Sequence, residues 1–261
     1  REEGAERSGM RSAIQAYRRR RYISDLHTHF LEKDTRAAAA GAKDPCREVV
    51  ALLRACATSG EALPSPAYAG PSTVADGQRG AFSRAAAPAG RVLALYPGTV
   101  HSPEDLRGTA APKNSFVAFA HDGMLFDGGT WSGFRDACGI AVGHLVNHPP
   151  AGREPNVVFW PCFLSDKIAA ELSCVVPNVR AARPDGSVAG GENVPVCRNL
   201  LAIVCAADVS ANEELLLDYR LEAGMRDDDL ASLPAWYRPV PDRGRPVWNE
   251  RFFFPAPWWP F

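Results

Sequence analysis

Two short segments about seventy residues apart carry the side chains best suited to chemistry. The first runs from Gly143 to His148 and the second from Asn212 to Tyr219. Each places amide, imidazole, carboxylate or phenol groups directly beside an apolar run, where an unpaired polar group is costly unless a partner satisfies it. A bound ligand is one candidate for that partner.

The second segment predicts a turn followed by a strand. A buried strand ends shortly before Asn212, which stands where the chain must turn, because asparagine tolerates positive φ. The carboxylate of Glu213 or Glu214 can then reach back to the amides of the turn. At strand periodicity the Tyr219 phenol shares one face with alternate leucines. That phenol either points into a cavity or has its hydroxyl capped by a backbone carbonyl.

Short apolar runs with strand character fill the middle of the chain, and Gly or Pro stands near most of their ends. They cover residues 91–96, 115–120, 156–163, 172–180 and 200–207. Because little helix lies between them, they favour several small antiparallel sheets over a parallel α/β architecture. Helical periodicity appears earlier, over residues 11–57. The predicted fold class is therefore mostly β (α+β) with an N-terminal helical extension.

Composition divides the 261 residues into three predicted parts. Residues 1–69 form a helical extension and a linker, because Gly, Pro, Ser and Ala dominate from about residue 63 onward. Residues 70–221 form the strand-rich domain. Residues 222–261 are crowded with aromatic residues and prolines, so they cannot form a long helix. So much aromatic surface is expected to pack on the domain or on a partner.

Charge and hydropathy limit the classes of partner. The 29 basic and 30 acidic residues give a formal net charge of -1, so nothing global indicates a nucleic-acid or membrane partner. The basic run Arg18 to Arg21 could make weak contact with phosphate, but a solvated helix face is the favoured interpretation. No stretch approaches the roughly 18 apolar residues that a membrane span needs.

Seven cysteines form an odd set without a close Cys-x-x-Cys pair. We expect reduced thiols in an intracellular protein, of the nucleus or the cytoplasm, rather than a disulfide framework or a zinc cluster. No metal ligand set is predicted. The sequence leaves the compartment unknown beyond that expectation.

One motif suggests a different chemistry. The run Asp25 to His29 places two imidazoles on one side of a strand, as at the metal site of amidohydrolase-like barrels. Those barrels need alternating strands and helices and further ligands downstream, and neither is evident. We therefore favour a surface or helix-packing pair of histidines. Serine hydrolase chemistry has no support either, because the chain lacks a Gly-x-Ser-x-Gly elbow.

The two polar segments also match known motifs. Asn147-His148, followed by Pro155-Asn156-Val157, resembles the Asn-His-Ser-Cys-x-Pro-Asn motif of SET-domain protein lysine methyltransferases. The segment Asn212 to Tyr219 resembles their Gly-Glu-Glu-Leu-x-x-Asp-Tyr motif. Order and spacing agree as well, and the resemblance covers about residues 72–220.

Two upstream stretches resemble the entry to the same domain. The run Gly77 to Phe82 resembles the glycine-rich cofactor loop of the family, and Tyr96 to Val100 resembles its strand with Tyr-x-Gly. The stretches Tyr96 to Val100 and Ala141 to Asn147 resemble the SET domain-containing protein 9 branch. The resemblance implies a SET-like fold, in which several small antiparallel sheets surround a C-terminal segment threaded under a loop.

The resemblance further implies a methyl transfer from S-adenosylmethionine to a lysine of a protein or peptide partner. Tyr219 would sit beside the transferring methyl group, and Tyr96 would line the lysine channel, where aromatic faces favour an ammonium group. The cofactor-binding residues implied in the same way are Gly77, Gly80, Ala81, Phe82, Asn147 and His148.

Three departures from the family pattern favour an alternative. Pro149-Pro150 and an insertion to Glu154 replace the Ser-Cys of the first motif, and the first glycine pair is spaced one residue wider than Gly-x-Gly. No cysteine follows Cys205, so the zinc-binding segment of many relatives is missing. The alternative is a catalytically degenerate SET-like scaffold or interaction module, since fold does not guarantee function.

Overall fold

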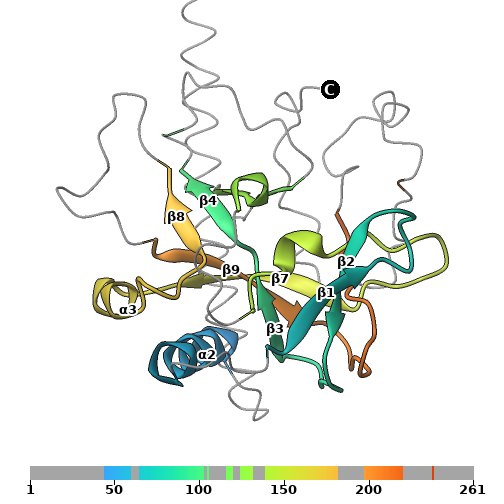
Figure 1. The fold of residues 1–261 in the computed structure, drawn as a ribbon, viewed down its shortest axis with the longest axis horizontal. Coiled ribbons are helices and arrows are strands. Elements are labelled where there is room, and N and C mark those ends of the chain that lie inside the picture. The colour runs from blue at the N-terminus through green and yellow to red at the C-terminus, as the bar shows by residue number, and fades with distance from the viewer. Residues whose placement is uncertain are drawn as a thin grey trace, which may run out of the picture. The chain divides into compact units, whose positions relative to one another are not determined.

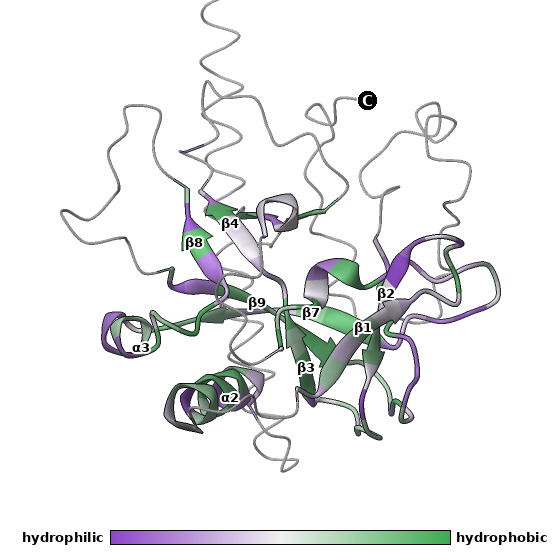
Figure 2. Cartoon of the chain, viewed as in Figure 1, coloured by the Kyte–Doolittle hydropathy of each residue, from purple (hydrophilic) through white to green (hydrophobic). Residues whose placement is uncertain are grey.

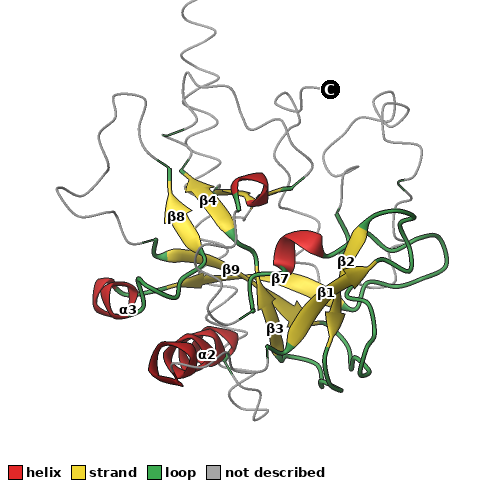
Figure 3. Ribbon diagram, viewed as in Figure 1, coloured by secondary structure: helices red, strands yellow, loops and turns green. Residues whose placement is uncertain are grey.

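Three small β-sheets dominate the part of the chain that the structure describes (Figure 1, Figure 3). The structure is a computed structural model, and it describes residues 44–59, 65–102, 105, 116–119, 124–131, 139–181, 197–219 and 237. All but residue 44 belong to one compact unit, Pro45–Phe261. The histidine motif and the basic run near the N-terminus lie outside the described residues, as does the 222–261 extension except Tyr237.

The sheets have two, three and four strands, and every pair but one is antiparallel. The first sheet pairs β1 (Ala67–Pro71) with β2 (Arg79–Ser83). The second has the order β3 (Val92–Leu95), β9 (Asn199–Cys205), β7 (Val157–Phe163). The third has the order β5 (Val117–Phe119), β6 (Leu125–Asp127), β4 (Gly98–His101), β8 (Asn178–Arg180), with β4 and β8 parallel.

The predicted mostly β architecture of several small sheets is confirmed for the described residues, and most predicted strands are found within two residues of their expected ends. One prediction is wrong in part. Residues 172–180 were expected to form a single strand, but helix α3 (Asp166–Glu171) ends in a turn over 172–175, and only Asn178–Arg180 is strand. The apolar residues that suggested a strand, including Leu172 in this turn, are buried in the core.

Strand β9 is the centre of the fold because both of its faces are buried. Its sequence Asn-Leu-Leu-Ala-Ile-Val-Cys is an uninterrupted apolar run after the first residue, as expected for a strand covered on two sides. Val204 belongs to one hydrophobic cluster, and its neighbour Ile203 to the other. Figure 2 shows the apolar colouring gathered on β3, β7 and β9. Strand β7 lies at the edge of this sheet, where its Pro161 is tolerated.

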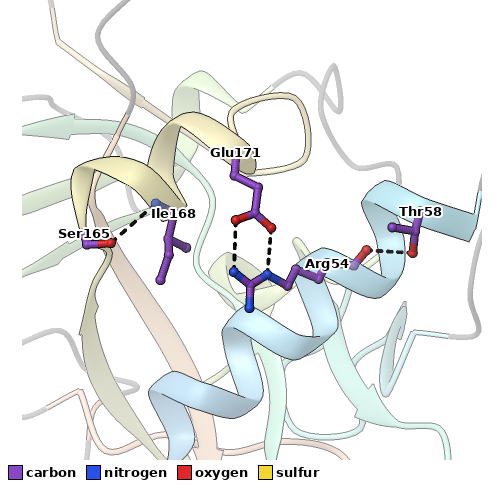
Figure 4. A network of polar contacts seen from close by, with 5 residues as sticks. All are labelled: Arg54, Thr58, Ser165, Ile168 and Glu171. Carbon is purple, nitrogen blue, oxygen red and sulfur yellow. Dashed lines mark hydrogen bonds and ion pairs between the residues drawn. The ribbon is translucent and has the colours of Figure 1, made fainter.

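Helix α2 (Pro45–Ser59) packs on the β3-β9-β7 sheet. Val49 and Leu53, four residues apart and therefore on one helix face, are fully buried in the cluster on that side. Helix α2 also contacts α3 through an ion pair in which Arg54 donates two hydrogen bonds, of 2.7 and 2.9 Å, to Glu171 (Figure 4). The helix agrees with the end of the predicted helical stretch, and residues 11–43 of that stretch lie outside the described residues.

The cysteines differ from expectation at one position. Cys56 on α2 is disulfide-bonded. The other described cysteines are thiols, namely Cys46, Cys162, Cys174, Cys197 and Cys205. The expectation that all seven thiols are reduced is therefore wrong for Cys56. Among the described residues, no helix is long and apolar enough to cross a membrane.

Gly98 permits the start of β4. Its φ of +110° lies in the region that favours glycine, and a Cβ at this position would collide with the backbone carbonyl of Asp127 on β6. Gly90 has a φ of +85° but open space around it. A side chain at Gly90 would therefore meet backbone strain alone, whereas one at Gly98 would meet both strain and a steric collision.

We expect Gly98→Ala to lower the free energy of unfolding by about 3 kcal/mol or more, because strain and collision combine. Gly90→Ala is the matched control, and strain alone should cost it about 1 kcal/mol. Chemical denaturation of both variants measures the difference. Equal losses would show that the approach of β6 to Gly98 does not constrain the fold.

Candidate functional site

The two polar segments predicted from the sequence meet in the structure. The segment 214–219 runs between the backbone at Asn147 and the start of β7. The Leu217 N–H donates to the Asn147 carbonyl at 2.8 Å, and the Asn156 N–H donates to the Leu216 carbonyl at 3.0 Å. The Leu215 N–H donates to Ala81 of β2 at 2.8 Å. One extended segment thus joins β2, Asn147 and β7.

The predicted turn before this segment is confirmed. Asn212 has a φ of +61°, the only positive value among the described non-glycine residues. Glu213 reaches back, as expected, and accepts a hydrogen bond of 2.8 Å from the Ser210 N–H. Its other oxygen accepts from the Asn156 amide at 2.9 Å. The turn therefore fixes the start of the segment.

Glu214 faces the opposite way, into the glycine-rich stretch before β2. Its carboxylate is only 3% exposed. It accepts hydrogen bonds from the Ser72 hydroxyl at 2.7 Å and from the N–H and hydroxyl of Thr73 at 2.7 and 2.5 Å. The Asn147 amide adds a fourth at 3.1 Å. Burial raises the pKa of this carboxyl, but the bonds from Thr73, Ser72 and Asn147 outweigh it, so the pKa lies below its usual range.

Asn147 is also committed to this network. Its Nδ2 lies within hydrogen-bond distance of Ser72 Oγ at 3.1 Å and of the Arg79 carbonyl at 3.0 Å, in addition to Glu214. Two N–H groups therefore serve three acceptors within the chain. The amide holds the glycine-rich loop in place, and its role toward a cofactor stays a prediction.

The glycines of the loop play two different parts. Gly80 is buried, and a Cβ there would collide with the Glu214 carboxylate, so its small size makes room for that side chain. Gly77 has a φ of +70° and nothing within 4 Å of a Cβ position, so it serves the turn and leaves space beside it. The side chains of Ala81 and Phe82 are buried, and Phe82 stacks on Tyr68 with ring centroids 5.5 Å apart.

His148 contacts two tyrosines. Its Nδ1 accepts a hydrogen bond of 3.2 Å from the Tyr219 N–H. Its ring lies 5.5 Å from that of Tyr219 and 4.5 Å from that of Tyr237, whose planes tilt by 48° and 31°. Tyr237 is the one described residue of the C-terminal extension, and it is buried at 2% exposure. The expectation that this extension packs on the domain therefore holds at this residue.

The Tyr219 hydroxyl is anchored by the first segment. It donates to the Val146 carbonyl at 2.8 Å, so of the two arrangements left open by the sequence the capped hydroxyl is observed. The residue as a whole is 37% exposed, which leaves part of its ring accessible. Burial of the hydroxyl end raises the pKa of Tyr219 to about 12, so the phenol is neutral near pH 7.

Tyr96 lies in an aromatic cluster with one ring from β6 and one from β7. Phe159 of β7 and Phe126 of β6 meet it edge-on, with ring centroids 5.8 and 6.5 Å away. Burial raises its pKa, and the neighbouring Tyr219 and Asp127 raise it further. The Tyr219 phenol is therefore near enough to act electrostatically on that of Tyr96, and the catalytic roles of both tyrosines stay predictions.

Sequence reasoning missed several of these residues. Asn178 is fully buried, and its Nδ2 donates to the Tyr96 carbonyl at 2.9 Å, which fixes the backbone of that tyrosine. Its only signal was an amide inside an apolar run. Ser72 and Thr73 carried no signal of their own, because their partner Glu214 lies far away in the sequence. Among the described residues, no group of three or more His, Cys, Asp or Glu side chains could hold a metal ion.

Comparisons with known proteins give a partial likeness of fold. No protein-family model and no curated protein sequence matches the chain, so the SET domain-containing protein 9 branch stays a prediction. A candidate histone methyltransferase of Plasmodium falciparum, PFL0690c, is similar with a TM-score of 0.36 and 14% identity, over 61% of this chain and 96% of that one. The structure of ctPRC2 in an autoinhibited conformation bound to S-adenosylmethionine is similar with a TM-score of 0.32 and 16% identity, over 60% of this chain and 15% of that one. With identity and TM-score this low, the likeness concerns only the fold.

The depressed pKa of Glu214 predicts a pH dependence of stability. A carboxyl whose pKa is lower in the folded protein than in the unfolded chain, where it is about 4.5, stabilises the fold at higher pH. This contribution to the free energy of unfolding is lost as the pH falls through the pKa of the folded protein. Glu214→Gln should lower the free energy of unfolding at pH 7 by about 2 to 3 kcal/mol and flatten its loss in acid. The pKa of Glu213 is also lowered, but this residue is less buried, so Glu213→Gln should show the same kind of change on a smaller scale. Denaturation from pH 7 to 3 that gave both variants the same profile would contradict the role of Glu214.

Proposed function

We propose that this chain transfers a methyl group from S-adenosylmethionine to lysine side chains of a protein or peptide. One observation carries the proposal: the segment that ends in Tyr219 pairs with Asn147, so that the imidazole of His148 and the phenol of Tyr219 share one site. The order of the motifs in the sequence supports the same activity. The comparisons add a partial likeness of fold and nothing about the reaction.

The glycine-rich loop fits a cofactor that needs close approach to backbone. Ser72 and Thr73 anchor it to Glu214, and the space beside Gly77 is open. The accessible part of the Tyr219 ring, with the His148 ring tilted beside it, offers an aromatic face for a heterocycle. Bound there, S-adenosylmethionine would supply a methyl group on a sulfonium sulfur. We assign cofactor contact to the loop backbone, to His148 and to the backbone of Asn147, whose amide is already engaged.

Tyr219 is suited to orient the reacting groups. Its hydroxyl proton is committed to the Val146 carbonyl, so the oxygen lone pairs stay available to accept contacts from a methyl C–H or an amine N–H. Because its pKa is raised, it remains a neutral acceptor near pH 7. Tyr96, with Phe159 and Phe126 edge-on to it, supplies an aromatic wall for a lysine side chain.

The lysine must lose a proton before it can react. Deprotonation of a side chain with a pKa of about 10.4 costs roughly 4 to 5 kcal/mol near pH 7. An aromatic channel lowers that cost, because desolvation disfavours the ammonium form. Two neutral phenols add no negative charge that would hold the proton, so the site favours the free amine without a dedicated base.

We further propose that the segment 214–219 is threaded under the loop 148–155. Its support is that Leu217 bonds to Asn147, at one end of the loop, while Leu216 accepts from Asn156 at the other. The domain is proposed to span residues 70–221, with 222–261 as an extension that reaches His148 through Tyr237.

One observation favours a catalytically degenerate scaffold as the second candidate. The Asn147 amide donates hydrogen bonds to Ser72, Arg79 and Glu214 instead of facing a ligand. In the scaffold, the same network would serve only to hold the domain together. Binding of the cofactor separates the two candidates.

Isothermal calorimetry with S-adenosylmethionine should show micromolar affinity, whereas a scaffold would show no binding at millimolar ligand. Gly77→Ala should weaken the affinity by roughly tenfold, because a side chain at positive φ distorts the proposed loop. Gly90→Ala carries similar backbone strain outside the loop and should bind as the parent does. Equal weakening in both variants would argue against a cofactor site at Gly77.

Tyr219→Phe should lower kcat by at least roughly tenfold while the affinity for the cofactor changes little, because the oxygen acts on the reacting groups. Incubation of the protein with radiolabelled cofactor and a cell lysate first identifies a labelled substrate, which then serves in the kinetics. Tyr68→Phe removes a hydroxyl that donates to Asn212 at 3.1 Å, and should leave the rate unchanged. Full activity of a folded Tyr219→Phe variant would refute this role.

A further inference from the structure

Two thiols from distant parts of the chain face one another beneath helix α2. The Sγ atoms of Cys46, the second residue of α2, and Cys162, on strand β7, lie 3.0 Å apart. We propose that these cysteines are an oxidative modification site, at which a disulfide fastens α2 to β7. This inference is independent of the proposed methyl transfer.

The geometry needs little adjustment. A disulfide bond is about 2.05 Å long, so the sulfurs must approach by about 1 Å. Helix α2 is held near both of its ends, which keeps the two thiols in register. Glu48 pairs with Arg91 at 2.6 Å and accepts from the Val92 N–H at 3.3 Å. Toward the other end, Arg54 forms an ion pair with Glu171 of α3 through two hydrogen bonds (Figure 4).

The two thiols differ in access, which sets the order of reaction. Cys46 is partly exposed, whereas Cys162 is 1% exposed. A small oxidised thiol such as glutathione disulfide therefore reacts first with Cys46. The Cys46 thiolate attacks one glutathione sulfur, which forms a mixed disulfide and releases one glutathione thiolate.

Cys162 completes the reaction. Its thiolate attacks Cys46 Sγ, the bond to glutathione breaks, and the second glutathione leaves. The protons of the two protein thiols end on the two glutathione molecules, so two electrons pass from the protein to the oxidant and the step balances. Fixed placement of the thiols favours this second attack over release of Cys46 by another glutathione.

Two other cysteines of the described residues provide controls. Cys174 is exposed in the turn after α3, so it can form a mixed disulfide with glutathione. Cys205 is buried, and burial raises the pKa of its thiol to about 11, which leaves little thiolate at neutral pH. Reaction at either position should not yield the link between α2 and β7.

The proposed link would act on a strand that supports the candidate site. Phe159 of β7 packs on Tyr96, and Val157 pairs with Leu217. A covalent bond at Cys162 would therefore hold the strand on which the aromatic cluster depends. Because the bond closes a loop of more than a hundred residues, it restricts the unfolded chain strongly.

The test is oxidation of the full chain with glutathione disulfide, followed by peptide mass mapping without reduction. We expect a peptide pair joined through Cys46 and Cys162, and a rise of roughly 5 to 10 °C in the unfolding midpoint relative to the same protein before oxidation. Cys46→Ser should abolish both the joined peptide and the rise. Cys174→Ser should retain both.

Cys162→Ala serves as a second variant, because Cys46→Ser alone could alter the packing of α2. Midpoints of the untreated variants identify any loss of folding. Glutathione adducts at Cys46 without the joined peptide, or the same rise in a folded Cys46→Ser variant, would overturn the proposal. Neither result depends on binding of S-adenosylmethionine.

Discussion

The buried carboxylate of Glu214 is the interaction on which the candidate site depends. It gathers Ser72, Thr73 and Asn147 from two places in the sequence, and Gly80 makes room for it. Four hydrogen bonds keep it charged despite burial, since an unpaired carboxylate in this position would be far too costly. The glycine-rich loop and the C-terminal segment are therefore one unit, and neither can take its shape without the other.

The same segment has two proposed roles along its length. Its first part, at Glu214, sets the loop proposed to meet the cofactor, and its end, at Tyr219, sets the phenol proposed to meet the methyl group. Backbone pairing with Asn147 and with the start of β7 fixes the distance between them. This pairing holds the segment in place without a ligand, which would favour alignment of the reactants in the proposed reaction.

Strand β7 of the β3-β9-β7 sheet contacts both α2 and the aromatic cluster at Tyr96. Phe159 stands on the strand that also carries Cys162, and α2 meets that strand through Cys46. The packing of α2 and the orientation of Tyr96 thus both depend on β7. The proposed disulfide would strengthen a contact that the fold already makes.

The sequence alone indicated the mostly β fold class, part of the strands and the turn at Asn212. Apolar runs bounded by Gly and Pro identified β3, β5, β7 and β9 but not β1, β2, β4 or β6. The positive φ of Asn212 followed from its side chain. Its motifs also indicated that residues 147–148 and 219 belong together. Local pattern could not show that Glu214 would bond to Thr73, or that Asn178 would hold Tyr96, because such contacts join residues about eighty or more apart. Only the tertiary structure decides them, since burial of a charge or an amide is settled by where the whole chain places its hydrogen-bond partners.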